Sequence, residues 1–292
     1  MKNLFKMMLF GSITLSSAIE AQTVKGFNHL ESVVADGRYF YVADIGKNLT
    51  PDAKDGDGKI LKLDSKGKIL ETTFAKETLN APKGLAIHKD ILFLTDIDRI
   101  VAVDKKTGTT LYQIDFSNDA HFLNDIAIWD ANTLYVSATD VSKLYKVNLL
   151  DKTYTEVVID KPIAGINGLF CYKKANLLYV NGLGTNNKSN GVVGFINLKN
   201  NTFTQLTVAE GIYDGLFVAN DVLYTSNWVA YEKKGILLSI QLSTRRINRL
   251  PLAEPIAGPA DFIIEGNSFV VPAMISGELH FLPYTNSLTQ KF

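Results

Sequence analysis

A short frame that recurs six times constrains the fold of this chain more than any other feature. Each copy has one variable residue, then a small or polar residue, then the start of an apolar run. The six copies are Glu31-Ser32-Val33-Val34, Lys83-Gly84-Leu85-Ala86-Ile87, Asn124-Asp125-Ile126-Ala127-Ile128, Asn167-Gly168-Leu169-Phe170, Asp214-Gly215-Leu216-Phe217-Val218 and Ala260-Asp261-Phe262-Ile263-Ile264. Consecutive copies start 52, 41, 43, 47 and 46 residues apart. A period near 45 is typical of a four-stranded propeller blade.

The residues between the frames support this interpretation. In the second repeat, runs at 84–87, 91–94, 99–103 and 110–114 are rich in apolar and β-branched residues, and turn sequences separate them. No long stretch after residue 21 has helical periodicity, which excludes a doubly wound α/β fold. The predicted fold is therefore all-β, a six-bladed β-propeller of four-stranded antiparallel blades. Either Ser287–Phe292 or Thr23–Phe27 can supply the last strand of the sixth blade, and the second choice closes the ring.

Residues 1–21 predict a secretory signal peptide. Lys2 and Lys6 form a basic start, and residues 7–18 are apolar or small but too few to span a membrane with ease. An uncleaved N-terminal anchor is the alternative. Residues 22–292 are then a single propeller domain, expected in the periplasm or outside the cell. No later segment approaches the roughly 20 apolar residues of a membrane helix, so we expect no membrane insertion of the mature chain.

Charge and cysteine content narrow the class of partner. The chain has 30 basic and 30 acidic residues, and this balance argues against nucleic acid or an anionic membrane as the main partner. The single cysteine, Cys171, excludes an intrachain disulfide. A small-molecule substrate or ligand is the expected partner, and no feature of the sequence identifies a protein partner.

Propeller topology predicts which segments share a face of the molecule. Strands within a blade run antiparallel, so the start of the first strand lies on the same face as the connection between strands two and three. That connection is long in blades one, four and five, at residues 45–58, 182–191 and 228–234. The six frames should therefore share a face with three long loops, an arrangement common at binding sites.

The first residue of each frame should lie at the mouth of the central channel. These residues are Glu31, Lys83, Asn124, Asn167, Asp214 and Ala260. Four of them offer carboxylate or amide oxygens, and the two carboxylates balance a divalent charge. All-oxygen ligands suit a hard cation, so Ca²⁺ is the expected ion, with Mg²⁺, Mn²⁺ or Zn²⁺ as alternatives. The competing interpretation is ordinary turn chemistry, because Asn, Asp and Gly are common at strand starts.

The order of these motifs resembles that of the gluconolactonase/regucalcin-like family of six-bladed propellers, which are metal-dependent lactone hydrolases. The residues that match are Glu31, Asn124-Asp125, Asn167-Gly168-Leu169 and Asp214-Gly215-Leu216. The resemblance implies that Glu31, Asn167 and Asp214 bind the metal ion, and that Asn124 binds metal, water or substrate. Phe122 departs from the pattern, because the sugar-acid lactonases have a substrate-binding Arg there. A sugar lactone is therefore not the expected substrate.

Two further positions are candidates for substrate binding. Lys83 should point into the channel, where it could bind an anionic group or stabilise an oxyanion; a salt bridge to Glu31 or Asp214 is the alternative. Trp228 and its neighbour Tyr231 could wall a substrate pocket or simply pack the loop of blade five.

Other motifs carry less weight. The run from Asp52 to Asp57 resembles part of a calcium loop but lacks the closing Glu, and we interpret it as a solvated turn. The four histidines show no metal-ligand spacing.

Two functions follow from these observations. The first is a metal-dependent hydrolysis of a lactone or related ester, with Asp214 as the catalytic base. The second is a non-catalytic exported propeller that binds a ligand or a protein, because propellers host many unrelated functions.

Overall fold

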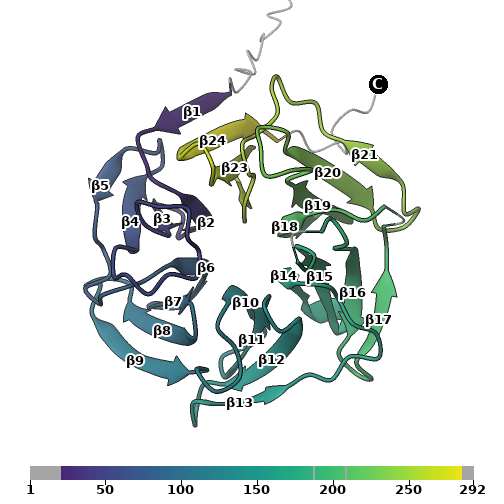
Figure 1. Cartoon of the computed structure of the whole chain (residues 1–292), viewed down its shortest axis with the longest axis horizontal. Helices are drawn as coiled ribbons and strands as arrows, with labels where there is room; N and C mark the ends of the chain where they lie inside the picture. Colours follow the sequence, from purple (N-terminus) through teal and green to yellow (C-terminus); the bar gives the residue numbers. More distant parts are fainter. Residues whose placement is uncertain (1–20, 187, 208, 285–292) are drawn as a thin grey trace, which may run out of the picture.

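The computed structural model describes residues 21–186, 188–207 and 209–284. Within these ranges the chain forms six four-stranded antiparallel sheets arranged radially around an axis (Figure 1). This confirms the predicted six-bladed propeller. Residues 1–20 of the predicted signal peptide lie outside the described ranges. The described part of the chain has no helix long and apolar enough to cross a membrane.

Blades one to three are each built from four consecutive strands. Blade one has β2 (Leu30–Ala35), β3 (Tyr39–Asp44), β4 (Lys59–Asp64) and β5 (Ile69–Glu71). Blade two has β6 (Pro82–His88), β7 (Ile91–Asp96), β8 (Arg99–Asp104) and β9 (Thr110–Asp115). Blade three has β10 (Leu123–Ile128), β11 (Thr133–Ala138), β12 (Lys143–Asn148) and β13 (Thr153–Glu156).

The other three blades follow the same plan, with one exception at the end of the chain. Blade four has β14 (Ile166–Tyr172), the short 3₁₀ helix η1 (Lys173–Ala175), β15 (Leu177–Gly182), β16 (Val193–Asn197) and β17 (Thr202–Gln205). Blade five has β18 (Tyr213–Ala219), β19 (Val222–Asn227), β20 (Ile236–Gln241) and β21 (Ile247–Arg249). Blade six has β22 (Ile263–Glu265), β23 (Ser268–Ala273), β24 (Glu278–Pro283) and β1 (Gln22–Lys25).

The N-terminal strand closes the ring. β1 pairs antiparallel with β24, from Gln22 opposite Phe281 to Lys25 opposite Glu278. Of the two segments considered for this role, the N-terminal one therefore supplies the strand, and Ser287–Phe292 lies outside the described residues. The pairing covers the outer edge of β24, which an open ring would expose.

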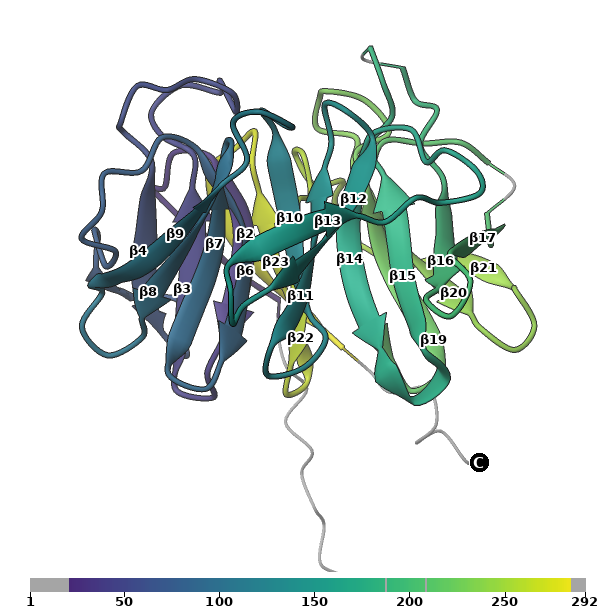
Figure 2. The same cartoon turned by 90° about the horizontal axis from the view of Figure 1, so that it is seen from below.

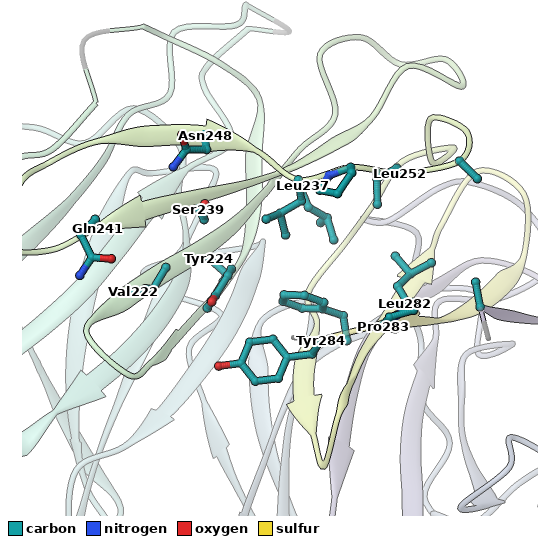
Figure 3. A pocket seen from close by; sticks show the side chains of 15 residues that line it. Val222, Tyr224, Leu237, Ser239, Gln241, Asn248, Leu252, Leu282, Pro283 and Tyr284 are labelled. Atoms are coloured by element: carbon teal, nitrogen blue, oxygen red, sulfur yellow. The ribbon is translucent and has the colours of Figure 1, made fainter. Parts of the chain in front are cut away.

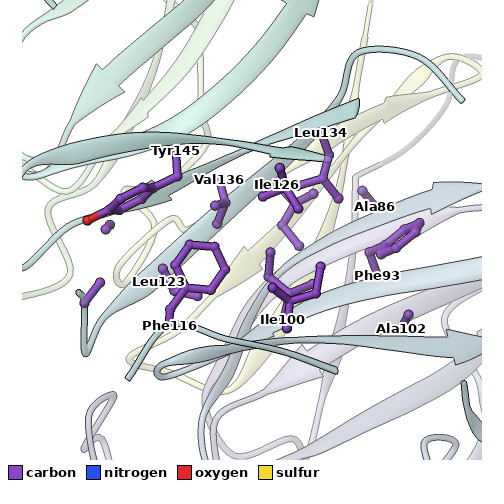
Figure 4. Close-up of a cluster of buried hydrophobic side chains, with 14 residues drawn as sticks. Ala86, Phe93, Ile100, Ala102, Phe116, Leu123, Ile126, Leu134, Val136 and Tyr145 are labelled. Atoms are coloured by element: carbon purple, nitrogen blue, oxygen red, sulfur yellow. The ribbon is translucent and has the colours of Figure 1, made fainter. Parts of the chain in front are cut away.

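Apolar side chains between adjacent sheets hold the blades together. Figure 4 shows one such layer, in which Phe93 and Ile100 of blade two face Ile126, Val136 and Tyr145 of blade three. All five are at least 95% buried. Burial of this apolar area on both faces of each inner strand supplies most of the stabilisation of such a fold.

The recurring frame coincides with a β-bulge in each of the first five blades. The register between the first and second strands shifts at Leu30/Ser32, Pro82/Leu85, Leu123/Ile126, Ile166/Leu169 and Tyr213/Leu216. The first residue of each frame lies inside the shift and pairs with no residue of the second strand. Bulges re-aim side chains in this way, and here they free the frame residues from the ladder.

Hydrogen bonds between blades fix the bulged segments. A polar side chain on the second strand of one blade donates to the backbone carbonyl of the frame residue in the next blade. Thr95 donates to Asn124 O at 2.5 Å, Asn181 to Asp214 O at 2.7 Å and Ser226 to Ala260 O at 3.2 Å.

Glycine at the second frame position permits the close approach of adjacent blades. A Cβ atom on Gly168 would lie 2.3 Å from Asp214 O, and one on Gly84 would lie 2.4 Å from Asn124 O. Side chains are thus excluded where the inner strands converge.

We expect Gly168→Ala to lower the free energy of unfolding by about 1–3 kcal/mol or more, because the new methyl group overlaps the backbone of blade five. Urea unfolding measures this loss. Gly266→Asn is the matched control: Gly266 has φ +57°, a Cβ atom added there would have no other atom within 4 Å, and Asn tolerates this conformation. Equal stability of the Gly168→Ala variant and the wild type would contradict the close approach.

Candidate functional site

The structure brings the five polar frame residues together at one end of the channel. Their inner strands surround the axis in Figure 1, and the strand starts lie on the side of the long loops in Figure 2. Each is 1–3% exposed: Glu31, Lys83, Asn124, Asn167 and Asp214. The sixth member, Ala260, is buried too and adds no polar group. We call the five polar residues the polar ring.

Several oxygen atoms of the polar ring lack a partner. Glu31 Oε2, Asn124 Oδ1, Asn167 Oδ1 and Asp214 Oδ1 are buried and accept no hydrogen bond from any described residue. A buried acceptor left unsatisfied costs about 1–3 kcal/mol, so a cation or hydrogen-bond donors, water included, in this space would stabilise the four oxygens, and the amide nitrogen of Asn167 lacks a partner among the described residues too. The described residues hold no group of three or more His, Cys, Asp or Glu side chains placed for a metal ion. Any cation here would be held by two carboxylates and two amides.

Burial controls the ionisation of the ring. Burial, with the negative charges of Asp214 and Asp261, raises the pKa of Glu31 well above its usual value, against the opposing effects of Lys83 and Asn124. Burial and the charge of Asp261 likewise raise the pKa of Asp214. Burial lowers the pKa of Lys83 to about 8 despite the nearby carboxylates. These shifts have one main cause, the burial of several ionisable groups, because uncompensated charge is costly away from water.

A second set of carboxylates, for which the sequence predicted no role, follows the ring in the chain. Asp125 accepts from the backbone N–H of Leu169 in the next blade and of Ile126, both at 2.6 Å. Asp261 accepts from Ser32 Oγ at 2.8 Å and so links blade six to blade one. Their oxygens are used by these bonds, so both residues join blades. The sequence feature that could have revealed these two carboxylates is the second frame position, which holds either a small residue or Asp.

Burial also raises the pKa of Asp125 and of Asp261, the latter to about 7, although their hydrogen bonds act in the opposite direction. With all four carboxylates ionised, Lys83 would be the one opposing charge among the frame residues. The channel mouth therefore favours binding of a cation or of protons.

Lys83 does not form the salt bridge that the sequence left open. Its Nζ donates to Ala81 O at 3.0 Å and lies 4.4 Å from the centroid of the Phe122 ring. No ion pair joins it to Glu31 or Asp214 in the described part of the chain. The backbone carbonyl and the aromatic face hold the ammonium instead. Phe122, at the position where the resemblance leads one to expect Arg, thus contacts Lys83 of the adjacent blade with its aromatic ring.

Trp228 contacts the polar ring directly. Its indole Nε1 donates to Asp214 Oδ2 at 3.0 Å, and the side chain is buried. This bond lowers the pKa of Asp214, although burial and the charge of Asp261 outweigh it. The contact orients the carboxylate and leaves Oδ1 without a partner. Trp228 therefore has a positioning contact that the sequence did not predict, and its contact with substrate remains a prediction.

The run from Asp52 to Asp57 lies in the loop between β3 and β4, and the charge of Asp52 opposes the lowering of the pKa of Lys83 by burial. Asp52 and Asp55 are exposed, and Asp57 accepts from the backbone N–H of Lys47 at 3.0 Å. That bond ties together the two ends of the loop.

A separate cavity of about 560 Å³ lies between blades five and six (Figure 3). Its lining includes Tyr224 and Leu237 of blade five and Phe269 and Tyr284 of blade six. None of its lining residues belongs to the polar ring, so this cavity is distinct from the channel mouth.

No protein-family model matches the chain, and a comparison with curated protein sequences finds no match. Solved structures show the same fold at low identity. Virginiamycin B lyase from Staphylococcus aureus is 16% identical with a TM-score of 0.61, over 91% of this chain and 99% of that one. A chain of the nidogen/laminin complex is 12% identical with a TM-score of 0.58, over 90% and 94% of the two chains. A protein of unknown function from Bacteroides thetaiotaomicron VPI-5482 is 12% identical with a TM-score of 0.64, over 90% and 76%.

The raised pKa values predict how stability depends on pH when no metal ion is present. Between about pH 4 and pH 7 the folded state holds protons that the unfolded state has lost, so the free energy of unfolding should fall as pH rises. Asp261 alone would contribute on the order of 2–4 kcal/mol. Lys83 acts in the opposite sense above about pH 8, because its folded-state pKa is lowered.

Urea unfolding in chelator at about pH 5 and pH 7 measures this fall. Asp261→Asn should flatten it, whereas the exposed Asp90→Asn should leave it unchanged. Stability that is constant or rises over this interval would contradict the assigned pKa values.

Proposed function

We propose that this protein is a hydrolase of a lactone or a related ester that depends on a divalent cation. The observation that carries the proposal is the set of four buried oxygens without partners, contributed by Glu31, Asn124, Asn167 and Asp214. The resemblance of the frame motifs to the gluconolactonase/regucalcin-like family supports the same assignment. A fold shared with a lyase is compatible with catalysis but does not identify a reaction.

The donor set fits a hard cation. Glu31, Asn167 and Asp214 would hold the ion, with Asn124 bound to it, to water or to substrate. Carboxylate and amide oxygens favour Ca²⁺, then Mg²⁺ or Mn²⁺; Zn²⁺ is less suited because the ring offers no His or Cys. When bound, the ion would polarise the substrate carbonyl and stabilise negative charge that develops on its oxygen.

The residues of the ring suggest how the proton moves. Water attacks the carbonyl carbon, and the carboxylate of Asp214, which would also be a ligand of the ion, accepts the proton from that water. The bond from the carbonyl carbon to the ring or ester oxygen then breaks, and the proton passes to the departing alkoxide. Trp228 holds Oδ2 of Asp214, so the base keeps one orientation throughout.

Lys83 would attract the carboxylate end of the product. Its ammonium lies in the ring without an ion-pair partner, so its positive charge is available to an anionic group. Asn124 and Asn167 would orient the substrate through their amide groups.

A second candidate is an exported propeller that binds a ligand or a protein without turnover. The near-complete burial of the polar ring favours it, because a substrate has no open route to the ring. The fold similarity to a chain of the nidogen/laminin complex agrees with a role in protein binding. Export to the periplasm or beyond the cell is part of both proposals and depends on the signal peptide at residues 1–21.

Metal binding provides the first test. After removal of ions with chelator, Ca²⁺ should raise the melting temperature, because an ion that binds only the folded state stabilises it by about 2.7 kcal/mol at 100 times its dissociation constant. Glu31→Gln and Asp214→Asn should each raise the dissociation constant for Ca²⁺ at least tenfold, as measured by calorimetric titration. The exposed Asp90→Asn is the control. No shift with Ca²⁺, Mg²⁺, Mn²⁺ or Zn²⁺, together with a neutral Glu31→Gln, would favour the binding protein.

Catalysis provides the second test. On a panel of aliphatic and sugar lactones, Asp214→Asn should lower kcat by about 100-fold or more through loss of the base. Trp228→Phe removes the N–H donor together with part of the buried indole ring, so the pKa of Asp214 should rise and the acidic limb of the pH–rate profile should move to higher pH. Equal activity of wild type and Asp214→Asn would remove Asp214 from the mechanism.

A further inference from the structure

A cluster of buried apolar side chains lies next to the polar ring at the mouth of the channel. Its buried members touch one another and come from four blades: Ile45, Ala81, Ile97, Ile212, Trp228, Ala260 and Met274. Leu183 of blade four and Ile275 of blade six pack against them. We call this set the cap. Its buried members come from blades five, six, one and two, which are consecutive around the ring, and Leu183 adds blade four to this side of the mouth.

Backbone hydrogen bonds place the cap one layer outside the ring. In several blades a backbone hydrogen bond joins the end of the second strand to the chain just before the first strand. The backbone N–H of the residue after the second strand donates to the carbonyl of the residue two positions before the frame residue. Ile45 N donates to His29 O at 3.0 Å, and Trp228 N donates to Ile212 O at 2.9 Å. These cap residues therefore lie between the ring and the loops on this face, whereas Ala260 lies at the level of the ring.

The cap offers almost no polar contact to a ligand. The indole N–H of Trp228 is the one side-chain donor in the cap, and Asp214 already accepts it. A polyhydroxylated lactone with its reactive carbonyl at the ring would place hydroxyl groups against Ile, Met and Leu side chains. Each unpaired hydroxyl would weaken binding by roughly 5- to 150-fold.

Backbone strain marks the cap independently of its composition. Among the eleven non-glycine residues described with positive φ, Ile97 (φ +59°) and Val229 (φ +63°) are the β-branched ones. Ile97 belongs to the cap, and Val229 follows Trp228. This conformation is unfavourable for β-branched residues and persists only where the surroundings impose it, typically at ligand-binding elements.

Apolar side chains continue from the cap to the surface. Tyr231 is 49% exposed, and its ring centroid lies 5.6 Å from that of Trp228. Val229 in the same loop and Leu49 in the loop of blade one are also large exposed apolar residues. Since the ring is almost inaccessible, a ligand reaches it only when part of the cap moves, and Tyr231, which contacts Trp228, offers an apolar ligand its first contact at the surface.

We infer that the substrate is a hydrophobic lactone or ester, with an alkyl or aryl substituent that packs against the cap while its carbonyl reaches the polar ring. This inference rests on the proposed function and names its substrate class.

The test compares γ-lactones with alkyl substituents of about one to seven carbons against glucono-δ-lactone. Each added methylene should raise kcat/KM about three- to fourfold until the cap is filled. The sugar lactone should be at least about 100-fold poorer than the best alkyl lactone. A flat or inverse dependence on chain length, or a preference for the sugar lactone, would overturn the inference.

Binding of non-hydrolysable 2-alkylcyclopentanones separates this inference from the proposed hydrolysis. Calorimetric titration of the methyl, butyl and heptyl compounds, with and without Ca²⁺, should show affinity that rises with chain length. If the affinity for these ketones rises with chain length but no lactone is hydrolysed, the result supports the apolar site and contradicts the proposed hydrolysis. If lactones are hydrolysed without dependence on chain length, the hydrolase stands and the apolar site fails.

Two variants localise the effect. Met274→Gln in the cap and Tyr231→Ser at its exposed edge should each reduce the gain per methylene, while the shortest compound binds within about threefold of wild type. The surface position of Tyr231 makes a folding defect in that variant less of a concern than in Met274→Gln. Leu252→Gln, in the separate cavity between blades five and six, is the control and should keep the full gain. An unchanged gain in Tyr231→Ser and Met274→Gln would place the apolar contact elsewhere.

Discussion

The convergence of six inner strands on one axis is the constraint on which this structure depends. Where the strands meet, adjacent backbones approach so closely that Gly168 has no room for a methyl group. The ladder cannot remain regular there, and in each of the first five blades a bulge releases the frame residue from strand pairing. The released residues point their polar groups at a common space. The geometry of the fold and the chemistry of the channel mouth therefore have the same origin.

Electrostatics at the mouth follows from that geometry. A closed ring buries Glu31 and Asp214 beside further carboxylates, and burial opposes their ionisation. The protein satisfies the outer carboxylates with hydrogen bonds between blades, as at Asp125 and Asp261. It leaves the inner oxygens unsatisfied, and unsatisfied buried groups commonly mark function rather than stability. The apolar cap lies next to them, and electrostatic interactions are stronger in such surroundings than in water.

Much of this arrangement could be predicted from the sequence. The period near 45 residues and the recurring frame predicted the blades. The first position of the frame predicted the polar ring, because every blade places that position at the axis. The contacts between elements could not be predicted. The bond from Trp228 to Asp214 joins a loop to a bulge, and the contact of Lys83 with Phe122 joins two blades. Side-chain direction across a sheet boundary is set by packing, which a repeat pattern does not encode. Apart from Trp228, the cap was missed because its members follow the second strands or precede the first strands and resemble ordinary strand ends.

The pairing of β1 with β24 also governs how the chain can fold. Gln22 and Phe281 become neighbours although almost the whole chain separates them. Contacts of such long range form late and slowly, because loop closure must precede them. Until residues 278–283 have been made, the first strand has no partner, and the incomplete ring exposes strand edges and blade faces at both ends. An incompletely synthesised or truncated chain is therefore an aggregation hazard, and its solubility until closure depends on keeping those edges protected.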